Sequence, residues 1–434
     1  MKETVKIGYV GVGRRGYNML TLSVGKMKDI EIVAICDLDE EKLERAKNAL
    51  VELGRPAPIC TTDVNEINAN PEIDAVMYFT GWNDRLKLAK ESMKAGKYTA
   101  IEVGCAENMQ DIYDIVDIYE KTGVPIMMLE NCCYSKREMM ALNMMRQGLL
   151  GEVFHMAGGY CHNLNAHELL QEICDWGGNE ITHYRLGHYI NGNCENYPTH
   201  ELGPIAKCLK INRGNRMLRL SSFASKSVCL KDFAKNNIGE DSEYAKIDYK
   251  QGDIVNTIIT CANGETILLT LDTTAPRNCY SRQFTVRGTK GMIYEDRKVV
   301  WLDGMEEIEG GNEDEAFEKY GHPLSKEAIE YETENTKIEE QFGLHADGVD
   351  WMIIRSFIEA VKNGTDTPID AYDTAVLLSI GLLSAESIQN GGAPVECPDF
   401  TNGKWNTERP IVKSKYSLDE VIVDNSIGIY DCAL

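Results

Sequence analysis

The sequence lacks the cysteine pairs and the long apolar runs that mark several large protein classes. Its 14 cysteines are scattered from Cys36 to Cys432, and no C-x-x-C pair occurs, which excludes a zinc ribbon or a thioredoxin-type site. No apolar run approaches the length of about 18 residues that a membrane-spanning helix needs. Because no secretory signal pattern precedes the first strand-like segment, we expect reduced thiols and a cytoplasmic location.

Positive charge is also scarce. The chain has 45 Lys and Arg against 68 Asp and Glu, a net charge of -23. This balance argues against nucleic acid as a partner, since phosphate backbones are bound by surplus Lys and Arg, and we expect no membrane partner. Residues 303–341 hold fourteen acids against three lysines. We interpret this stretch as a solvated surface insertion, with a partner-binding role as the less favoured alternative.

A length of 434 residues exceeds a single domain of roughly 100 to 200 residues. In the first part, short apolar segments alternate with helix-compatible ones, which predicts a parallel sheet covered on both faces. We therefore expect an α/β fold with a doubly wound parallel Rossmann sheet in residues 1–129. The expected helices cover 16–26, 40–53, 86–95 and 109–122, and the expected strands cover 5–11, 30–37, 75–80, 98–103 and 125–130.

After residue 150 the pattern changes to strands that alternate apolar and polar residues, which is typical of a sheet with one buried face. These strands are expected at 152–160, 216–223, 254–260, 266–272 and 282–288, with helices at 347–363 and 371–389. The sequence predicts a second, α+β domain over residues 130–434 with an open, mostly antiparallel sheet. We expect the active site between the two domains, and the exposed face of the second sheet favours a homo-oligomer, a dimer or tetramer.

A glycine-rich turn directly follows the first expected strand. Gly11, Gly13 and Gly16 form G-x-G-x-x-G at the start of a helix, and Asp37 ends the next strand 21 residues beyond Gly16. Such glycines allow a tight turn and close approach of a pyrophosphate, while the acid binds a ribose hydroxyl and repels a 2′-phosphate. No arginine follows Asp37, so the predicted cofactor is NAD.

Two short segments imitate the zinc motif H-E-x-x-H, but Gln171 and Pro204 stand where the second histidine is required. Neither can be a zinc helix, and we expect no metal. Three other histidines, at positions 155, 322 and 345, are assigned surface or packing roles by default. The roles of the histidines at 162, 183 and 188 stay open because they neighbour the segments described next.

A specific resemblance is carried by several segments of the chain. These are G-V-G-R-R-G, A-I-E-V at 100–103, M-L-E-N at 128–131, G-G-Y-C-H-N at 158–163, N-Y-P-T-H-E-L-G-P-I, D-T-T-A-P-R-N-C-Y-S and C-P-D-F-T-N-G-K-W. The chain resembles the Gfo/Idh/MocA oxidoreductase superfamily and, within it, the NAD-dependent glycosidases of glycoside hydrolase family 109, the α-N-acetylgalactosaminidase branch. The resemblance spans almost the whole chain, apart from the acidic insertion and residues 163–182.

This resemblance implies a set of contact residues. Cofactor contacts are expected from the three glycines and from Arg14, Arg15, Asp37, Thr80, Trp82, Asn83, Arg85, Glu102, Val103 and Asn131. Substrate contacts are expected from Tyr160, Arg185, Tyr197, Pro198, Thr199, His200 and Tyr280. Members of the family oxidise the sugar at C3, eliminate the aglycone across C1 and C2, add water and reduce the ketone again, so that hydrolysis involves no net redox change.

The residue types suit that scheme. Oxidation at C3 acidifies the C2 hydrogen, so the site needs a base for the hydroxyl, a base for C2 and a group that stabilises the oxyanion. Tyr160, Tyr197 and His200 are the candidates, because histidine titrates near neutrality and a cation such as Arg185 can lower the high pKa of a tyrosine. Glu130, at a strand's carboxyl end, is the candidate acid for the leaving group. The simpler alternatives are a turn at Tyr197-Pro198 and a solvated Glu130.

Some positions depart from related patterns. Many dehydrogenases of the superfamily carry lysine directly after the glutamate in E-K-P, whereas this chain has Glu102-Val103-Gly104, which favours glycoside hydrolysis, on substrates such as α-N-acetylgalactosaminides. Against the glycosidase branch, Asn163 replaces an aspartate and Arg85 replaces a histidine. The alternative function is a plain NAD-dependent sugar dehydrogenase, and a non-enzymatic NAD sensor ranks third.

Overall fold

The computed structural model describes residues 2–165, 169–170, 184–306, 310–325, 348–407, 412 and 415–418. The chain forms two compact units. The first comprises the described residues within 1–143, 319–375 and 409–434, and the second those within 144–318 and 376–408. The expected division into 1–129 and 130–434 treats the domains as consecutive blocks, whereas the chain returns to the first unit after building most of the second.

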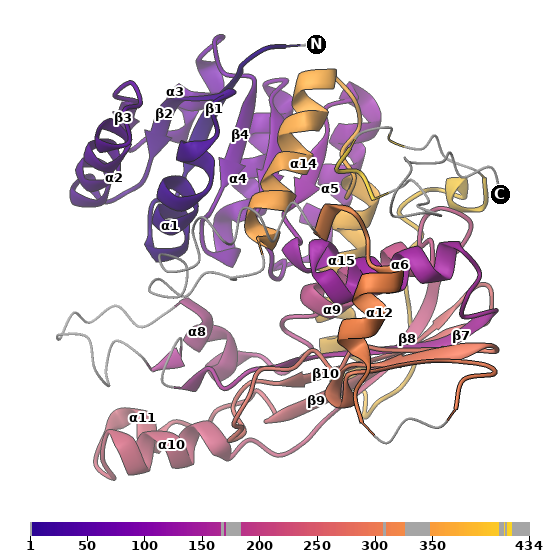
Figure 1. Ribbon diagram of the computed structural model, residues 1–434. Helices are drawn as coiled ribbons and strands as arrows, with labels where there is room; N and C mark the ends of the chain where they lie inside the picture. Colours follow the sequence, from indigo (N-terminus) through magenta and orange to yellow (C-terminus); the bar gives the residue numbers. More distant parts are fainter. Residues whose placement is uncertain are drawn as a thin grey trace. The chain divides into compact units, whose positions relative to one another are not determined.

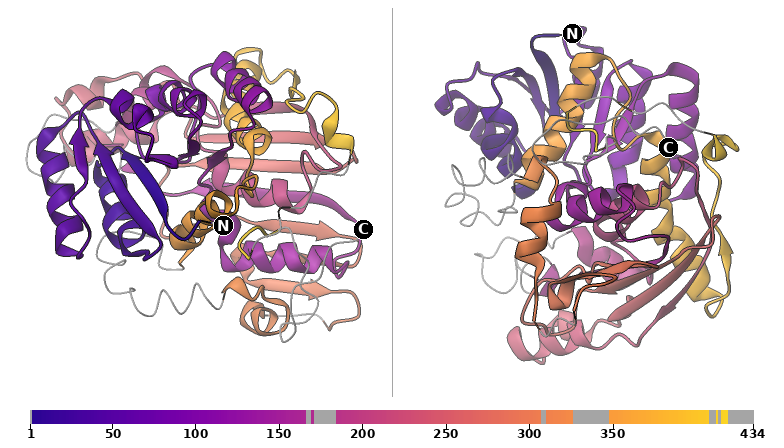
Figure 2. Two further views of the ribbon diagram at one scale, coloured as in Figure 1. Left: turned by 90° about the horizontal axis from the view of Figure 1, so that it is seen from above. Right: turned by 45° about the vertical axis from the view of Figure 1, so that its right-hand side comes forward.

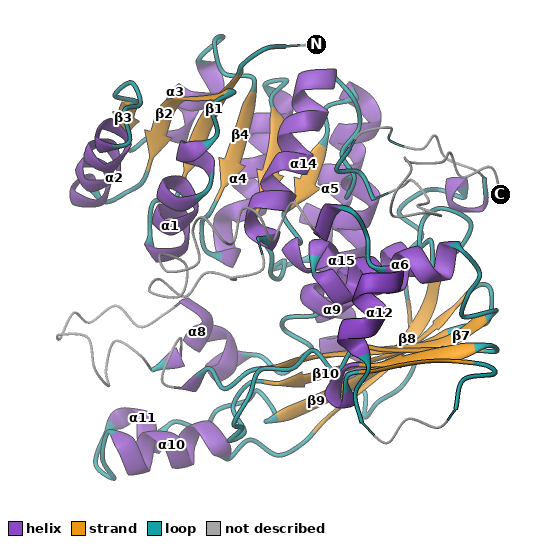
Figure 3. Cartoon of the chain, viewed as in Figure 1, coloured by secondary structure: helices purple, strands orange, loops and turns teal. Residues whose placement is uncertain are grey.

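The first unit is built on a parallel sheet of six strands in the order β3-β2-β1-β4-β5-β6. The strands are β1 (Val5–Val10), β2 (Ile30–Cys36), β3 (Ile59–Thr61), β4 (Ala75–Tyr78), β5 (Tyr98–Ile101) and β6 (Ile126–Met128). Their arrows run the same way in Figure 3. The strand order reverses between β1 and β4, which is the arrangement of a doubly wound nucleotide-binding sheet. The predicted Rossmann fold is confirmed.

Helices of this unit connect successive strands or follow the last one. They are α1 (Arg14–Leu22), α2 (Glu40–Glu52), α3 (Val64–Ala69), α4 (Trp82–Lys94), α5 (Met109–Thr122) and, after the 3-10 turn η2 (Asn131–Tyr134), α6 (Lys136–Arg146); the 3-10 turn η1 (Val24–Lys26) follows α1. Strand β3 and helices α3 and α6 were not predicted from the sequence. The predicted start of α4 was residue 86, whereas the helix already begins at Trp82, so residues 82–85 form a helical turn and not the expected loop.

Helix α14 (Val349–Asn363) belongs to this unit although it lies more than 200 residues later in the chain. Figures 1 and 2 show it, in orange, running beside the parallel strands. Arg355 donates to both carboxylate oxygens of Asp29 at 2.7 and 3.1 Å, and Lys362 donates to Asp29 at 2.9 Å. These ion pairs fix α14 to the loop that enters β2.

The second unit is built on an eight-stranded sheet in the order β13-β12-β11-β7-β10-β9-β8-β14. Its strands are β7 (Val153–Cys161), β8 (Met217–Ala224), β9 (Ile254–Cys261), β10 (Thr266–Asp272), β11 (Thr285–Gly288), β12 (Gly291–Tyr294), β13 (Val299–Leu302) and β14 (Val395–Glu396). Every neighbouring pair is antiparallel except β7 with β10. The predicted open, mostly antiparallel sheet is therefore confirmed.

The helices α8 (Tyr184–Asn191), α9 (Thr199–Cys208), α10 (Cys229–Asn237), α11 (Glu243–Lys246), α12 (Glu313–Tyr320) and α15 (Ala371–Gln389) complete the described elements, together with the 3-10 turns η4 (Glu295–Arg297) and η5 (Lys404–Asn406). Part of the predicted acidic insertion is α12, in which Glu313 and Ala316 are buried, so this part is packed and not simply solvated. Residues 307–309 and 326–341 of that insertion lie outside the described residues.

Helix α15 is long and apolar enough to cross a membrane by length and composition. Yet 78% of its apolar window is buried within the protein, and Ser384 and Ser387 accept hydrogen bonds from the backbone N–H groups of Glu195 and Ser222. These contacts are those of a helix buried in the protein core. The expectation that no segment of the chain reaches this length and apolarity was wrong for α15.

The ion pairs of Asp29 predict an acid-dependent stability. Partial burial would raise the pKa of Asp29, but hydrogen bonds and charges from Arg355 and Lys362 lower it to about 2. Because the folded pKa lies below the unfolded value, the stabilisation is complete above about pH 4 and disappears as the pH falls through 2. We expect Asp29→Asn to lower the free energy of unfolding by about 1–2 kcal/mol at pH 7, after allowance for solvent screening.

Urea unfolding of wild type and variant between pH 2 and 7 measures this effect. Asp84→Asn is the matched control, since Asp84 is 73% exposed and pairs with Lys87 only at 3.4 Å. A pH-independent difference between wild type and Asp29→Asn would contradict the assignment.

Candidate functional site

The glycine-rich turn after β1 has the shape that the sequence predicts. Gly11 has a positive φ of +92°, and a Cβ on it would lie 2.6 Å from the carbonyl oxygen of Phe79. A Cβ on Gly16 would lie 2.0 Å from the carbonyl oxygen of Gly11. A Cβ on Gly13, by contrast, would meet nothing within 4 Å. The first and third glycines are thus required by packing, while the second leaves open space at the first turn of α1, where a pyrophosphate would bind.

Asp37, directly after β2, helps to hold this turn in place. Its carboxylate accepts the backbone N–H of Val12 at 2.7 Å and that of Asp39 at 3.1 Å. Each carboxylate oxygen has a second lone pair, so a ribose hydroxyl could still bind. The residue therefore has a structural task in the turn besides the predicted cofactor contact.

Arg15 lies in an ion network at the carboxyl end of the sheet. Its Nε donates to Glu102 at 2.9 Å, and its two terminal nitrogens each donate to Asp350 of α14 at 2.7 Å. Asn131 donates its side-chain amide to the same Asp350 at 2.7 Å, and Glu102 accepts the N–H of Val103 at 2.8 Å. Burial alone would lower the pKa of Arg15, but Asp350 and Glu102 raise it well above its usual value.

The first turn of α4 is also tied to the segment that follows strand β5. The buried Arg85 donates to the carbonyl oxygen of Val103 at 2.8 Å, and Trp82 packs against Gly104, where a Cβ would lie 2.0 Å from the indole nitrogen. Thr80, at the end of β4, has a buried hydroxyl with no hydrogen-bond partner in the described part of the chain. Asn83 and Arg14 are exposed.

These features fit a bound dinucleotide. The open side of Gly13, the unpartnered hydroxyl of Thr80 and the carboxylate of Asp37 occur along the carboxyl ends of β1, β4 and β2, which is the edge where doubly wound sheets bind such cofactors. The predicted cofactor residues thus share one edge of one sheet, while their individual contacts with NAD stay predictions.

Glu130 follows β6 and is fully buried. One carboxylate oxygen accepts the N–H of Cys132 at 2.9 Å, so the residue caps the 3-10 turn η2. The alternative of a solvated strand-end acid is therefore wrong, because the side chain is enclosed by protein.

In the second unit, the predicted substrate residues form a cluster of aromatic rings. The ring of Tyr160 stacks on that of Tyr197 with centroids 4.4 Å apart, and it meets His200 edge-on at 5.5 Å and Tyr280 at 6.2 Å. The guanidinium of Arg185 lies over Tyr197, 4.7 Å from the ring centroid. We call these five residues, together with His162, the ring cluster.

Three local features assemble the ring cluster. Gly158 of β7 would place a Cβ 2.6 Å from that of Glu201, so the glycine allows α9, with His200 in its first turn, to approach the strand closely. Pro198 stands at the N-terminal cap of α9 and Thr199 begins the helix, so the expected turn at Tyr197-Pro198 is the entry to a helix. Cys161 and Ser281 exchange backbone hydrogen bonds at 3.1 Å, which brings Tyr280 beside Tyr160.

His162 joins the ring cluster although the sequence analysis left its role open. Its Nδ1 lies 3.4 Å from the phenolic oxygen of Tyr160, and its ring centroid lies 5.3 Å from that of Tyr280. Residues two positions apart in an extended chain point to the same side, so the Y-x-H spacing could have identified it. His183 and the H-E pair at 167–168 lie outside the described residues.

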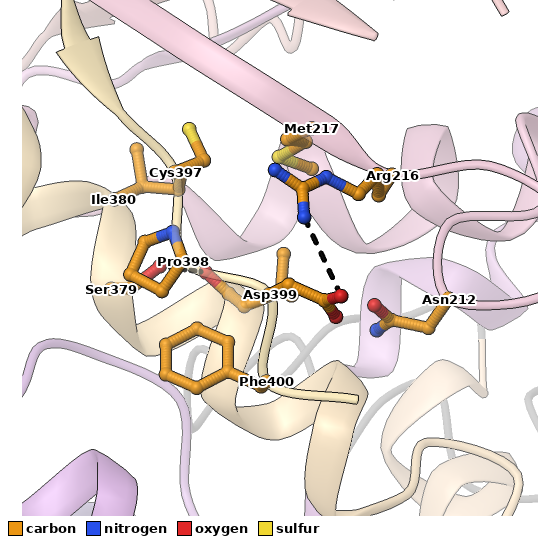
Figure 4. Close-up of a pocket in the computed structure, with 10 residues that line it drawn as sticks. Asn212, Arg216, Met217, Ser379, Ile380, Cys397, Pro398, Asp399 and Phe400 are labelled. Carbon is orange, nitrogen blue, oxygen red and sulfur yellow. Dashed lines mark hydrogen bonds and ion pairs between the residues drawn. The ribbon is translucent and has the colours of Figure 1, made fainter. Parts of the chain in front are cut away.

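A small pocket elsewhere in the second unit is shown in Figure 4. Arg216 pairs with Asp399 at 3.5 Å, and Asp399 also accepts the backbone N–H groups of Thr401 and Gly403 at 2.9 and 2.8 Å. No predicted site residue lines this pocket. The segment C-P-D-F-T-N-G-K-W therefore has a structural role, in which Asp399 folds the tail against the start of β8.

Comparisons with known protein families agree with this division. The family described as "Oxidoreductase family, NAD-binding Rossmann fold" matches residues 5–130, and "Glycosyl hydrolase 109, C-terminal domain" matches residues 134–407. An alpha-N-acetylgalactosaminidase of Tannerella forsythia is 35% identical over 428 residues, covering 94% of this chain and 88% of the relative. "Glycosyl hydrolase family 109 protein 2" of Phocaeicola vulgatus is 36% identical over 408 residues, covering 92% and 95%.

Solved structures share the fold at low sequence identity. An NAD-binding oxidoreductase from Klebsiella pneumoniae has a TM-score of 0.68 at 16% identity, covering 92% of this chain and all of the neighbour. The scyllo-inositol dehydrogenase of Lactobacillus casei, solved with NAD(H) and scyllo-inositol, has a TM-score of 0.60 at 16% identity, covering 91% and 99%. These neighbours share the two-part architecture of the fold.

A buried carboxyl group lies two residues before Tyr197 of the ring cluster. Glu195 is 1% exposed, and one of its oxygens has no hydrogen-bond partner within the described residues. Burial raises the pKa of Glu195 to about 8, against the lowering effect of a hydrogen bond from the backbone N–H of Tyr197. A pKa of about 8 keeps the group mostly protonated at pH 7.

This burial predicts that stability decreases as the pH rises. The unfolded glutamate ionises near pH 4.5 while the folded one keeps its proton to about pH 8, so the free energy of unfolding falls across this interval. Glu195→Gln keeps an acceptor for the N–H of Tyr197 but cannot ionise. We expect its melting temperature, relative to wild type, to be higher at pH 8.5 than at pH 5, as thermal unfolding followed by circular dichroism would show. An equal difference at both pH values would refute the burial argument.

Proposed function

Because the chain belongs to glycosyl hydrolase family 109, we propose that it hydrolyses glycosides by transient oxidation at the sugar C3, elimination of the aglycone, addition of water and final reduction. The observation that carries this proposal is the ring cluster. Direct displacement at C1 uses two carboxyl groups about 5 to 10 Å apart, whereas the ring cluster supplies phenols, imidazoles and a guanidinium. Such groups suit proton transfer at a carbon next to a ketone.

We assign each proton transfer of the proposed cycle to one residue of the ring cluster. In the proposal, His200 takes the proton of the C3 hydroxyl. The residues at the carboxyl edge of the parallel sheet would hold NAD, which would supply the capacity for reversible hydride transfer at C3. Tyr160 then takes the acidified C2 proton, for which the phenol must first lose its own. Nδ1 of His162, 3.4 Å from the phenolic oxygen, is placed to receive that proton, and the guanidinium of Arg185 near Tyr197 favours negative charge on the phenols.

Glu130 is the proposed acid for the leaving group. Its side chain is completely buried and caps η2, and a carboxyl group that carries a proton can donate it to the departing glycosidic oxygen. Loss of the aglycone leaves a 3-keto sugar with a double bond between C1 and C2. Addition of a hydroxyl group at C1 and a proton at C2, followed by reduction at C3, restores the sugar.

The proposed cofactor is NAD rather than NADP. A carboxylate at Asp37 repels a 2′-phosphate and accepts ribose hydroxyl protons, and its position is fixed by the N–H groups of Val12 and Asp39. The proposed substrate class is α-N-acetylgalactosaminides, on the strength of the Tannerella forsythia relative. A sugar dehydrogenase is the second candidate, favoured by the fold of the inositol dehydrogenase neighbour and disfavoured by Val103 in place of a lysine.

Two further proposals concern the state of the protein. On the outer face of the second sheet, Ile258 is 51% exposed and Phe223 is 59% exposed, and such an apolar face favours a homo-oligomer, a dimer or tetramer. Each of the twelve cysteines in the described part of the chain is a free thiol, which supports a reducing, cytoplasmic compartment.

The proposed cycle predicts two linked results. Hydrolysis of an aryl α-N-acetylgalactosaminide should continue for many turnovers with NAD in catalytic amount and without growth of NADH absorbance. In heavy water, the released sugar should carry deuterium at C2, because elimination breaks that carbon–hydrogen bond and direct displacement leaves it intact. Absorbance spectroscopy and mass spectrometry of the product measure both.

Tyr160→Phe provides the residue-level test, since the phenyl ring keeps the stacking on Tyr197 but cannot transfer a proton. We expect kcat to fall by about 10²-fold or more while the Kd for NAD stays unchanged. Release of unlabelled sugar in heavy water would exclude the elimination route. Stoichiometric NADH without aglycone release would favour the dehydrogenase.

A further inference from the structure

The carboxylate of Asp350 receives three hydrogen bonds from residues at the dinucleotide-binding edge. Both terminal nitrogens of Arg15 and the amide of Asn131 donate to it at 2.7 Å. We propose that Asp350 is a positioning residue that fixes the part of the site that binds the nicotinamide half of NAD. This inference rests on the proposed use of NAD and adds a residue from a distant segment to the cofactor site.

The place of this network on the sheet indicates which half of the cofactor it serves. In a doubly wound sheet the adenosine half lies over the strands on one side of the strand-order reversal, and the nicotinamide half over those on the other. Asp37 follows β2 on the first side. Glu102 follows β5 and Asn131 follows β6 on the second side, so Asp350 and its partners stand at the nicotinamide end.

The ion pairs of Arg15 favour a structural role for this residue over the expected contact with the cofactor. Its guanidinium is shared between Glu102 and Asp350, so one positive charge meets two negative ones. A cation that is already neutralised contributes little to the binding of a pyrophosphate. Arg15 is better described as a brace between the first turn of α1, the end of β5 and α14.

The same network orients Asn131. Because its Nδ2 donates to Asp350 at 2.7 Å, the amide is fixed with its oxygen on the opposite side, 3.6 Å from the sulfur of Cys132. Without Asp350 the amide could rotate and exchange donor for acceptor. Asp350 therefore orients Asn131, a residue expected to contact the cofactor, although the two lie 219 positions apart in the sequence.

Helix α14 holds Asp350 firmly. The residue lies in the first turn of the helix, where the helix dipole stabilises a negative charge. Further along α14, Arg355 and Lys362 bind Asp29. The helix is therefore anchored at two places, and Asp350 is presented from a rigid element.

The test uses the full-length protein and two ligands, NAD and ADP, titrated by calorimetry. Asp350→Asn removes the charge that holds Arg15 while keeping the size of the side chain. Loss of a charged, buried hydrogen-bond partner predicts an increase of about tenfold or more in the Kd for NAD. Because ADP contacts only the adenosine side, its Kd should change by less than about twofold.

Three variants control the measurement. Asp350→Glu keeps the charge and should restore NAD binding to within about threefold of wild type. Asp37→Ala should weaken NAD and ADP alike, because it acts on the adenosine half. Asp366→Asn changes an acid of the same unit that accepts from Tyr119, and both Kd values should stay at the wild-type level.

The outcomes are distinguishable. If Asp350 has only a structural role, Asp350→Asn lowers the melting temperature but leaves the ratio of the two Kd values unchanged, and the inference is overturned. A similar loss for ADP and NAD also overturns it. If the wild-type protein binds ADP but not NAD, this result contradicts the proposed cofactor and does not bear against the placement of Asp350. Should Asp350→Asn fail to fold, the pair Arg15→Gln with Asp350→Asn replaces the ions with neutral amides and must show the same selective loss.

Discussion

The ion pairs of helix α14 are the interaction on which the first unit depends. Asp29, at the entry to β2, binds Arg355 and Lys362, while Asp350 at the other end of the helix binds Arg15. Between these ends, Ile354 and Phe357 are fully buried. Helix α14 thus holds the glycine-rich turn and the ends of β5 and β6 in place, although it lies far outside the G-x-G-x-x-G motif in the sequence. The cofactor site therefore depends on residues beyond that motif.

The ring cluster brings side chains that can exchange protons close together within one unit. The imidazole of His162 lies near the phenol of Tyr160, and the guanidinium of Arg185 lies over the ring of Tyr197. Gly158 makes the arrangement possible because any larger residue would push α9 away from β7. The small residue in the strand is therefore what allows the aromatic side chains at its end to come together.

Sequence reasoning was most successful where the signal is local. The spacing of Gly11, Gly13 and Gly16 and the acid at Asp37 predicted the turn because each acts within a few residues of its position. Helix α15 was predicted as an amphipathic helix with both ends correct, but it is apolar along its whole length and mostly buried. The start of α4 was missed because its cap, Gly81, offers no side-chain acceptor that marks a helix start. Asp350 could not be found, because nothing in one sequence indicates that residues 15, 131 and 350 converge.

The first unit is formed by segments that lie on both sides of the second unit in the sequence, and this arrangement affects folding during synthesis. A ribosome completes residues 1–143 long before it reaches α14, so the elements against which the helix packs, η2 and β1, are without it during that time. Partly made domains with exposed apolar surface are prone to aggregate or to be held by chaperones. The nucleotide-binding unit of this chain therefore cannot finish folding as it emerges, and its completion waits for the synthesis of almost the whole protein.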